Sequence, residues 1–253
     1  MKKASFLNND RPLLCVMVQD ATPEEMIATI NNALYDGAEA FGIQLEWLDK
    51  EFRTEEYLRA IFSACRGLPI YITSYRNGRG NMTDEECREL LLLGARCGAT
   101  LCDVMGDMYD PVPNEITFQE AAVEKQKKLI EEIHALGCEA LMSTHLHGFY
   151  EKEDVYTYAK AQRERGVDVV KIVNFAYSEE ELLKNIEICA GLKDEIDCEY
   201  LYLANGEHCR LLRQIGGKLG CCMYLCVVRY GGVYSKEQTL LRSQKAIRDN
   251  MIL

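Results

Sequence analysis

The sequence predicts a single-domain (β/α)8 barrel, the TIM-barrel fold of the α/β class, over residues 1–253. Short apolar runs alternate with amphipathic stretches eight times along the chain. The runs are continuously apolar, which is typical of parallel strands buried on both faces. About 250 residues is also the usual size of eight such units. An open doubly wound sheet is the alternative, but its Gly-x-Gly-x-x-Gly turn is absent after the first run.

Each apolar run is bounded by turn residues and followed by a stretch with helical periodicity. We expect strands at 13–18, 40–45, 69–74, 99–105, 139–144, 167–174, 199–204 and 220–227. We expect helices at 23–35, 54–65, 83–97, 117–136, 152–165, 178–191, 206–215 and 236–249.

Residues with clear capping preferences mark several of these boundaries. Thr22, Thr83 and Ser178 each stand just before a helix, with glutamate three residues later. Four glycines precede the next strand, where a left-handed residue ends a helix without a Cβ clash. They are Gly37, Gly98, Gly137 and Gly166.

Composition excludes several classes of partner. The 29 Lys and Arg against 40 Asp and Glu give a net charge of −11, which repels nucleic acids and acidic membrane surfaces. No apolar run approaches the ~20 residues of a membrane span, and the N-terminus has no signal-peptide core. The 12 cysteines form no Cys-x-x-Cys pair, and several lie in apolar runs, as in a reducing compartment. We therefore expect a cytoplasmic protein with a small-molecule substrate, bound to neither nucleic acid nor membrane.

Active sites of (β/α)8 barrels lie at the carboxyl ends of the strands, so polar residues there are the candidates. They are Gln44, Glu46, Arg76, Asp103, His145, His147 and Lys171, with Arg213 and Gln238 near the last two strands.

Lys171 is the most informative candidate because it is a cation inside an apolar run with no acid next to it in sequence. A buried lysine can lose its proton and attack a carbonyl carbon to form an imine. The alternative is a lysine that reaches the barrel rim or pairs with an acid from elsewhere. His145 ends the preceding strand, where it could act as a base beside such an imine. His147 could complete a His-x-His metal pair, but no carboxylate for it is identifiable, so we expect neither metal nor cofactor.

At these residues the chain resembles the type I 3-dehydroquinate dehydratases, (β/α)8 enzymes of the shikimate route that remove water through a lysine imine. Six segments match the family's motifs in order and spacing over about 230 residues. They are Arg11 to Val16, Ser74-Tyr75-Arg76, Ser143-Thr144-His145, Asp168 to Ile172, Asn205 to Arg213, and Ser235 to Gln238.

The resemblance implies a role for each matched residue. Lys171 would form the imine, and His145 would act as general base and return the proton to the departing hydroxide. Arg213 would hold the substrate carboxylate, while Arg76 and Gln238 would bind hydroxyls and close the site. The resulting hypothesis is a carbon–oxygen lyase acting on 3-dehydroquinate or a related cyclic β-hydroxyketone carboxylate.

Three positions differ from the family pattern. Its glutamate-x-arginine after the second strand is Gln44-Leu45-Glu46 here, its aspartate-x-glutamate on the fourth is Asp103-Val104-Met105, and its lid serine is Tyr234. The resemblance implies that the glutamate replaced by Met105 orients the histidine. We hypothesise that Glu46 takes over as the partner of His145, or that Glu46 reads a hydroxyl or amine absent from dehydroquinate.

Other interpretations remain open at this stage. The chain could be an imine-forming aldolase or lyase with another substrate, or a non-catalytic relative that binds a metabolite. Gly216-Gly217 and Gly231-Gly232 could mark a phosphate site, although turns also need glycine. The segment 107–115 could be a lid or a partner surface, and a homodimer is possible.

Overall fold

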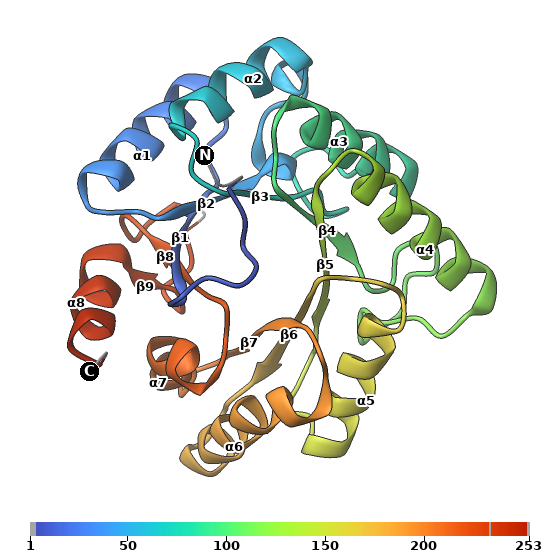
Figure 1. Cartoon of the computed structure of the whole chain (residues 1–253), viewed down its shortest axis with the longest axis vertical. Coiled ribbons are helices and arrows are strands. Elements are labelled where there is room, and N and C mark those ends of the chain that lie inside the picture. The colour runs from blue at the N-terminus through green and yellow to red at the C-terminus, as the bar shows by residue number, and fades with distance from the viewer. Residues whose placement is uncertain (1–3, 233, 252–253) are drawn as a thin grey trace.

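The computed structural model describes residues 4–232 and 234–251, and its strands form one curled parallel sheet inside a ring of helices (Figure 1). The strand order is β7-β6-β5-β4-β3-β2-β1-β8-β9. A backbone hydrogen bond from Cys222 N to Tyr200 O (2.9 Å) links the start of β8 to β7 and closes the circle. The predicted (β/α)8 barrel is therefore confirmed.

The strands are β1 (Leu13–Val18), β2 (Ala40–Gln44), β3 (Ile70–Thr73), β4 (Leu101–Met105), β5 (Glu139–His145), β6 (Val169–Phe175), β7 (Glu199–Asn205), β8 (Met223–Val227) and the short β9 (Thr239–Leu240). The helices are α1 (Pro23–Tyr35), α2 (Glu55–Ala64), α3 (Asp84–Cys97), α4 (Glu120–Ala135), α5 (Lys152–Arg163), α6 (Glu179–Glu195), α7 (Arg210–Ile215) and α8 (Leu241–Met251), with 3-10 turns η1 (Leu45–Trp47), η2 (Lys50–Phe52) and η3 (Gly216–Leu219).

The expected elements are all present, and the largest errors in where an element begins lie near the carboxyl ends of β7 and β8. Helix α7 begins at Arg210 rather than at 206, because Gly206 adopts a φ of +95° and its N–H binds Glu237. Helix α8 begins at Leu241 rather than at 236, because the residues before it form β9 alongside β8. Tertiary contacts thus override local helical periodicity at both places.

The predicted caps are confirmed. The side chain of Thr22 accepts a hydrogen bond from Glu25 N, Ser178 accepts one from Glu181 N, and Thr83 forms a reciprocal capping box with Glu86. The four predicted glycines have φ values between +76° and +118°. These positions end each helix in a left-handed residue and turn the chain into the next strand.

The N-terminal segment covers the amino ends of the strands. Phe6 is buried, and its N–H donates to Glu139 at the start of β5, while Asn8 N donates to Glu199 at the start of β7. In Figure 1 this segment, in dark blue, crosses the middle of the ring. With the amino end covered, the opposite end is left for a ligand.

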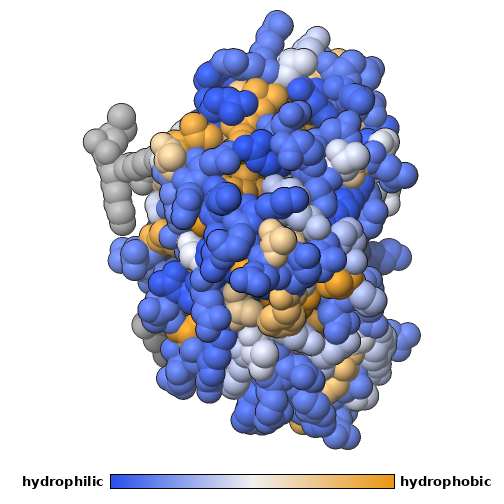
Figure 2. All heavy atoms as spheres, turned by 90° about the vertical axis from the view of Figure 1, so that its right-hand side faces the viewer, coloured by the Kyte–Doolittle hydropathy of each residue, from blue (hydrophilic) through white to orange (hydrophobic). Residues whose placement is uncertain are grey.

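One side face of the barrel is mainly hydrophilic. Figure 2 shows one side face, where apolar atoms lie in separate spots among polar ones. No helix within residues 4–232 and 234–251 is long and apolar enough to cross a membrane. All cysteines except Cys198 are buried, and no disulfide forms in these ranges.

Two helix starts provide a matched test of capping. Thr83→Ala removes a capping box, so we expect the free energy of unfolding to fall by about 1 kcal/mol in urea denaturation. Thr54 begins α2 without a side-chain capping bond, so Thr54→Ala is the control and should change stability much less. Equal losses in the two variants would contradict this assignment.

Candidate functional site

A cavity of about 200 Å³ opens at the carboxyl ends of the strands, and side chains from seven of the eight main strands or the residues just after them line it. They are Met17, Gln44, Thr73, Tyr75, His145, Lys171, Val173, Leu203, Asn205 and Leu225, joined by Arg213 from α7 and by Ser235, Glu237 and Gln238 before α8. The predicted residues Gln44, His145, Lys171, Arg213 and Gln238 thus meet in one place.

Lys171 faces this cavity and is also paired with an acid. Its Nζ lies 3.0 Å from Tyr71 Oη, 2.9 Å from Tyr75 Oη and 3.3 Å from Asp103 Oδ2. Both tyrosine hydroxyls donate to the same carboxylate oxygen of Asp103. The lysine is only 4% exposed. The acid that the local sequence lacks is therefore supplied by β4, two strands away in the sheet.

His145 has a carboxylate partner that sequence reasoning did not identify. Its Nδ1 lies 2.8 Å from Glu115 Oε2, and its backbone N–H donates to the same oxygen at 3.2 Å. Burial by itself would raise the pKa of Glu115, but the hydrogen bonds and charge of His145 outweigh burial and lower it below the usual value. The hypothesis that Glu46 is the partner of His145 is wrong, because Glu115 occupies that position.

The segment 107–115 is a loop that carries this carboxylate, and hydrogen bonds of the loop backbone hold it in place. Glu115 has a left-handed backbone with φ +48°, its N–H bonds to Val112 O, and its carbonyl accepts from Thr144 Oγ1. Buried Arg165 donates to the carbonyls of Gly106 and Thr117 at the two ends of the loop. The loop is therefore fixed against the barrel at the end that carries Glu115.

Glu46 lies behind the cavity wall and is 1% exposed. Its carboxylate accepts from Thr73 Oγ1 at 2.8 and 3.0 Å and from Gln44 Nε2 at 3.1 Å. Burial raises the pKa of Glu46 to about 7. Because Gln44 donates to Glu46 through Nε2, its amide oxygen Oε1 points away from Glu46. Glu46 therefore acts on the cavity only through Gln44 and Thr73.

Arg213, from α7, is a second cationic side chain that lines the cavity. Its Nε donates to Ala204 O at 2.7 Å and its Nη2 donates to Asn205 Oδ1 at 2.6 Å, which fixes the guanidinium plane. Burial lowers its pKa from the ordinary arginine value. Glu237 lines the same cavity and is held by Gly206 N and Ser235 Oγ.

Two other predicted site residues point elsewhere. Arg76 forms ion pairs with Asp84 (2.6 Å) and Asp107 (2.8 Å). Because these two acids hold its guanidinium, Arg76 does not line the cavity. Tyr234 is buried and donates to Asp20 Oδ2 at 2.9 Å, so its hydroxyl is directed at the end of β1.

Three residues at or beside the cavity were absent from the candidates, and a fourth, Asp103, was a candidate without an assigned role. Tyr75 lies inside the predicted Ser-Tyr-Arg segment, so position alone could have selected it. Glu237 sits beside the predicted Gln238. Nothing local distinguishes Glu115 from the other acids of its loop, because only the loop's backbone brings it to the histidine.

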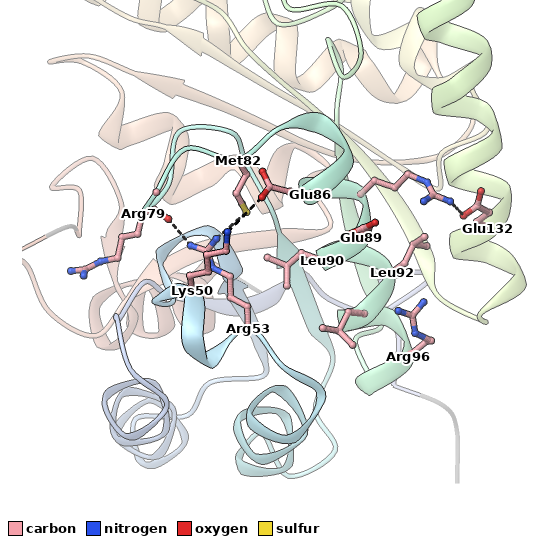
Figure 3. A pocket seen from close by; sticks show the side chains of 13 residues that line it. Lys50, Arg53, Arg79, Met82, Glu86, Glu89, Leu90, Leu92, Arg96 and Glu132 are labelled. Atoms are coloured by element: carbon pink, nitrogen blue, oxygen red, sulfur yellow. Dashed lines mark hydrogen bonds and ion pairs between the residues drawn. The ribbon is translucent and has the colours of Figure 1, made fainter.

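A larger hollow, of about 780 Å³, lies on the outside of the barrel between η2 and α3 (Figure 3). It shares no lining residue with the first cavity. Three of its five cations form ion pairs with acids: Lys50 with Glu86, Arg79 with Asp49, and Arg88 with Glu85 and Glu132. The hollow is therefore a groove of mixed charge, remote from the converging polar groups.

Metal ligands do not gather in the described part of the chain, where no group of three or more His, Cys, Asp and Glu side chains could hold an ion. The converging groups are instead a buried amine, an imidazole with a carboxylate partner, and a guanidinium. In a (β/α)8 barrel, such groups at the carboxyl ends of the strands define an enzyme active site.

Comparison with known proteins identifies the class more closely. The sequence model of the type I 3-dehydroquinase family matches residues 14–229. The chain therefore belongs to this family. It is accordingly a carbon–oxygen lyase, a dehydratase of the shikimate pathway class. No curated protein matches the chain in sequence.

Solved structures share the fold at low sequence identity. The 3-dehydroquinate dehydratase of Geobacillus kaustophilus HTA426 superposes with a TM-score of 0.82 at 14% identity, covering 97% of this chain and 93% of that one. The type I enzyme of Clostridium difficile, with covalently modified comenic acid, gives 0.81 at 16% identity, with 97% and 94% covered. The Enterococcus faecalis enzyme gives 0.79 at 12% identity, with 99% of each chain covered.

The buried carboxyl of Glu46 predicts a pH dependence of stability. Its pKa of about 7 in the folded state exceeds the ordinary value of 4.5, so the folded state holds an extra proton between these pH values. Stability should fall as pH rises from about 4.5 to 7, by roughly 3 kcal/mol at about 1.4 kcal/mol per unit, and then level off.

Glu46→Gln should remove this decline while keeping the bond to Thr73. Urea denaturation from pH 4.5 to 8.5 measures it, with the exposed Glu131→Gln as control. If Glu46→Gln retains the wild-type pH dependence, Glu46 does not carry the raised pKa.

Proposed function

We propose that the protein is a Schiff-base-forming dehydratase that removes water from 3-dehydroquinate or a related cyclic β-hydroxyketone carboxylate. The observation that carries this proposal is the convergence of Lys171, His145 and Arg213 on one small cavity. These groups supply a nucleophilic amine, a general base and a carboxylate anchor, the three parts that the reaction requires.

The cavity supports a ligand that bears both a carboxylate and hydroxyl groups. Arg213 offers a guanidinium, whose planar geometry suits a carboxylate. Gln44 Oε1 and Gln238 Oε1 are buried and accept no hydrogen bond from the described residues. A buried acceptor without a donor is costly, so each of these oxygens favours a ligand hydroxyl.

In the proposed reaction the amine of Lys171 replaces the ketone oxygen, which leaves as water. The iminium draws electrons from the adjacent carbon, so His145 can remove a proton from that carbon and leave an enamine. The enamine then expels the β-hydroxyl group, which takes the proton back from His145 and departs as water. Hydrolysis of the remaining imine releases the enone and restores Lys171.

Glu115 is a positioning residue in this scheme, because it acts on the substrate only through His145. A carboxylate on Nδ1 fixes the ring and its tautomer, so that Nε2 is the nitrogen available to take a proton. It also stabilises the imidazolium that proton abstraction creates.

Reductive trapping tests the imine. Incubation with dehydroquinate and borohydride should give a covalent adduct on Lys171, located by peptide mass spectrometry, while enone absorbance reports product. Lys171→Met should show neither adduct nor enone. An adduct without enone would assign imine chemistry on another substrate, such as that of an aldolase. No adduct with any keto acid would reject the dehydratase and favour a metabolite-binding protein.

Removing the partner of His145 tests the base. Glu115→Gln should lower kcat about 10-fold or more, because the imidazolium loses its counter-charge. Glu46→Gln is the matched control, because Glu46 makes no hydrogen bond to His145. An unchanged kcat in Glu115→Gln, or an equal loss in the control, would contradict the assignment.

A further inference from the structure

The surroundings of the Lys171 amine fit an ammonium group, which cannot attack a carbonyl carbon. An ammonium carries three protons, and three acceptor oxygens lie within 3.3 Å of Nζ, on Tyr71, Tyr75 and Asp103. This arrangement satisfies the charged form and leaves no lone pair for a carbonyl carbon. Imine formation, on which the proposed function rests, therefore needs a built-in route that takes one proton away.

Tyr75 lies where such a route would begin. Its hydroxyl is 2.9 Å from Lys171 Nζ, 2.6 Å from Asp103 Oδ2 and 3.2 Å from Ser143 Oγ, and the side chain lines the cavity. Its ring meets that of His145 edge-on, with centroids 5.6 Å apart. The hydroxyl therefore touches both the amine and the acid, and it lies on the side of the amine that a ligand approaches.

Tyr71 makes the same two bonds from a different place. Its hydroxyl also reaches Lys171 Nζ and Asp103, but the side chain is fully buried and does not line the cavity. Tyr71 can thus orient the amine but cannot reach a ligand.

Asp103 is suited to receive the proton. It is completely buried, and its Oδ1 accepts no hydrogen bond from the described residues. Its Oδ2 already accepts hydrogen bonds from Tyr75 and Lys171, so a proton that leaves the amine has a short path to this oxygen.

We infer that Tyr75 is a catalytic residue that relays a proton from Lys171 to Asp103 and back to the departing water. In the forward step Lys171 Nζ gives a proton to Tyr75 Oη while Tyr75 gives its own proton to Asp103 Oδ2. The products are a neutral amine, a neutral tyrosine and a protonated Asp103, so no tyrosinate forms.

The return step balances the reaction. The neutral amine adds to the ketone carbon, and a second nitrogen proton moves to the former ketone oxygen, giving a carbinolamine. Asp103 then returns its proton through Tyr75 to that hydroxyl, the C–O bond breaks and water leaves. The iminium keeps the third proton, and Asp103 is again a carboxylate.

Several other ionisable groups face this cluster. Cys15 lies near Lys171 from β1, Glu46 lies near Tyr75, and His145, Arg213 and Glu237 line the same cavity. Within the described residues, only Asp103 and the two tyrosines are hydrogen-bonded to Nζ. None of the other groups is therefore a direct proton acceptor of this amine.

The test compares Tyr75→Phe with Tyr71→Phe, since each removes one hydroxyl from the same amine and acid. The rate of adduct formation at Lys171 is followed by borohydride quenching and peptide mass spectrometry between pH 6 and 9. Tyr75→Phe should slow the reaction about 100-fold, and Tyr71→Phe less than 10-fold. Tyr75→Phe should also depend on bulk deprotonation, so its rate should rise about 10-fold per pH unit where the wild-type rate is much flatter.

Equal losses in the two variants, or a wild-type pH slope in Tyr75→Phe, would overturn the relay. If Tyr75→Phe does not fold, as judged by its thermal transition, Tyr75→Met decides, because it removes the same hydroxyl and leaves the ion pair of Lys171 with Asp103 in place. Tyr75→Met should show the same loss and the same steep slope, and a flat profile would overturn the relay.

A second probe separates this inference from the proposed function. Glycolaldehyde can form an imine without matching any natural substrate. Adducts with glycolaldehyde but none with dehydroquinate would reject the proposed substrate, while the relative rates of the two variants would still test the relay. Failure of both compounds to modify Lys171 would overturn the relay itself, because the amine would then form no imine.

Discussion

The contact between Lys171 and Asp103 inside the barrel is the interaction on which the rest of the site depends. A lone ammonium in a wall of apolar strands would be too costly to keep, and a lone carboxylate equally so. Two tyrosine hydroxyls join the pair, and together with Asp103 they accept from the three donor positions of the amine. The cluster therefore allows a charged lysine to be buried beside a cavity. In the proposed reaction, Lys171 attacks a carbonyl carbon only after one proton leaves its amine.

Barrel geometry explains why residues so distant in sequence meet at this pair. The parallel strands bring the ends of β3, β4, β5 and β6 to one edge, and the register places Ser143 opposite Lys171. The opposite end is covered by the N-terminal segment through Phe6 and Asn8. The cavity is thus open only where the strands end, and side chains from neighbouring strands face each other across a few ångströms.

The sequence predicted the fold well because continuous apolar runs, capping hydroxyls and left-handed glycines are local signals. It placed Lys171 within the sixth strand and His145 at the end of the fifth for the same reason. It failed for Arg76, whose direction is set by ion pairs with Asp84 and Asp107. It also failed for Glu115, whose position depends on a left-handed backbone within an irregular loop. Periodicity carries no information on such loops, so the partner of His145 could only be found in three dimensions.

The left-handed backbone of Glu115, the partner of His145, has a structural consequence. A non-glycine residue in the left-handed region costs about 1–2 kcal/mol, so the loop would not hold Glu115 in this conformation without support. Arg165 binds both ends of the loop and Arg76 binds Asp107 within it. Arg76 therefore serves the active site from a distance, as an anchor of the loop. The orientation of the imidazole consequently depends on the integrity of this loop as well as on the barrel, which couples two otherwise separate parts of the structure.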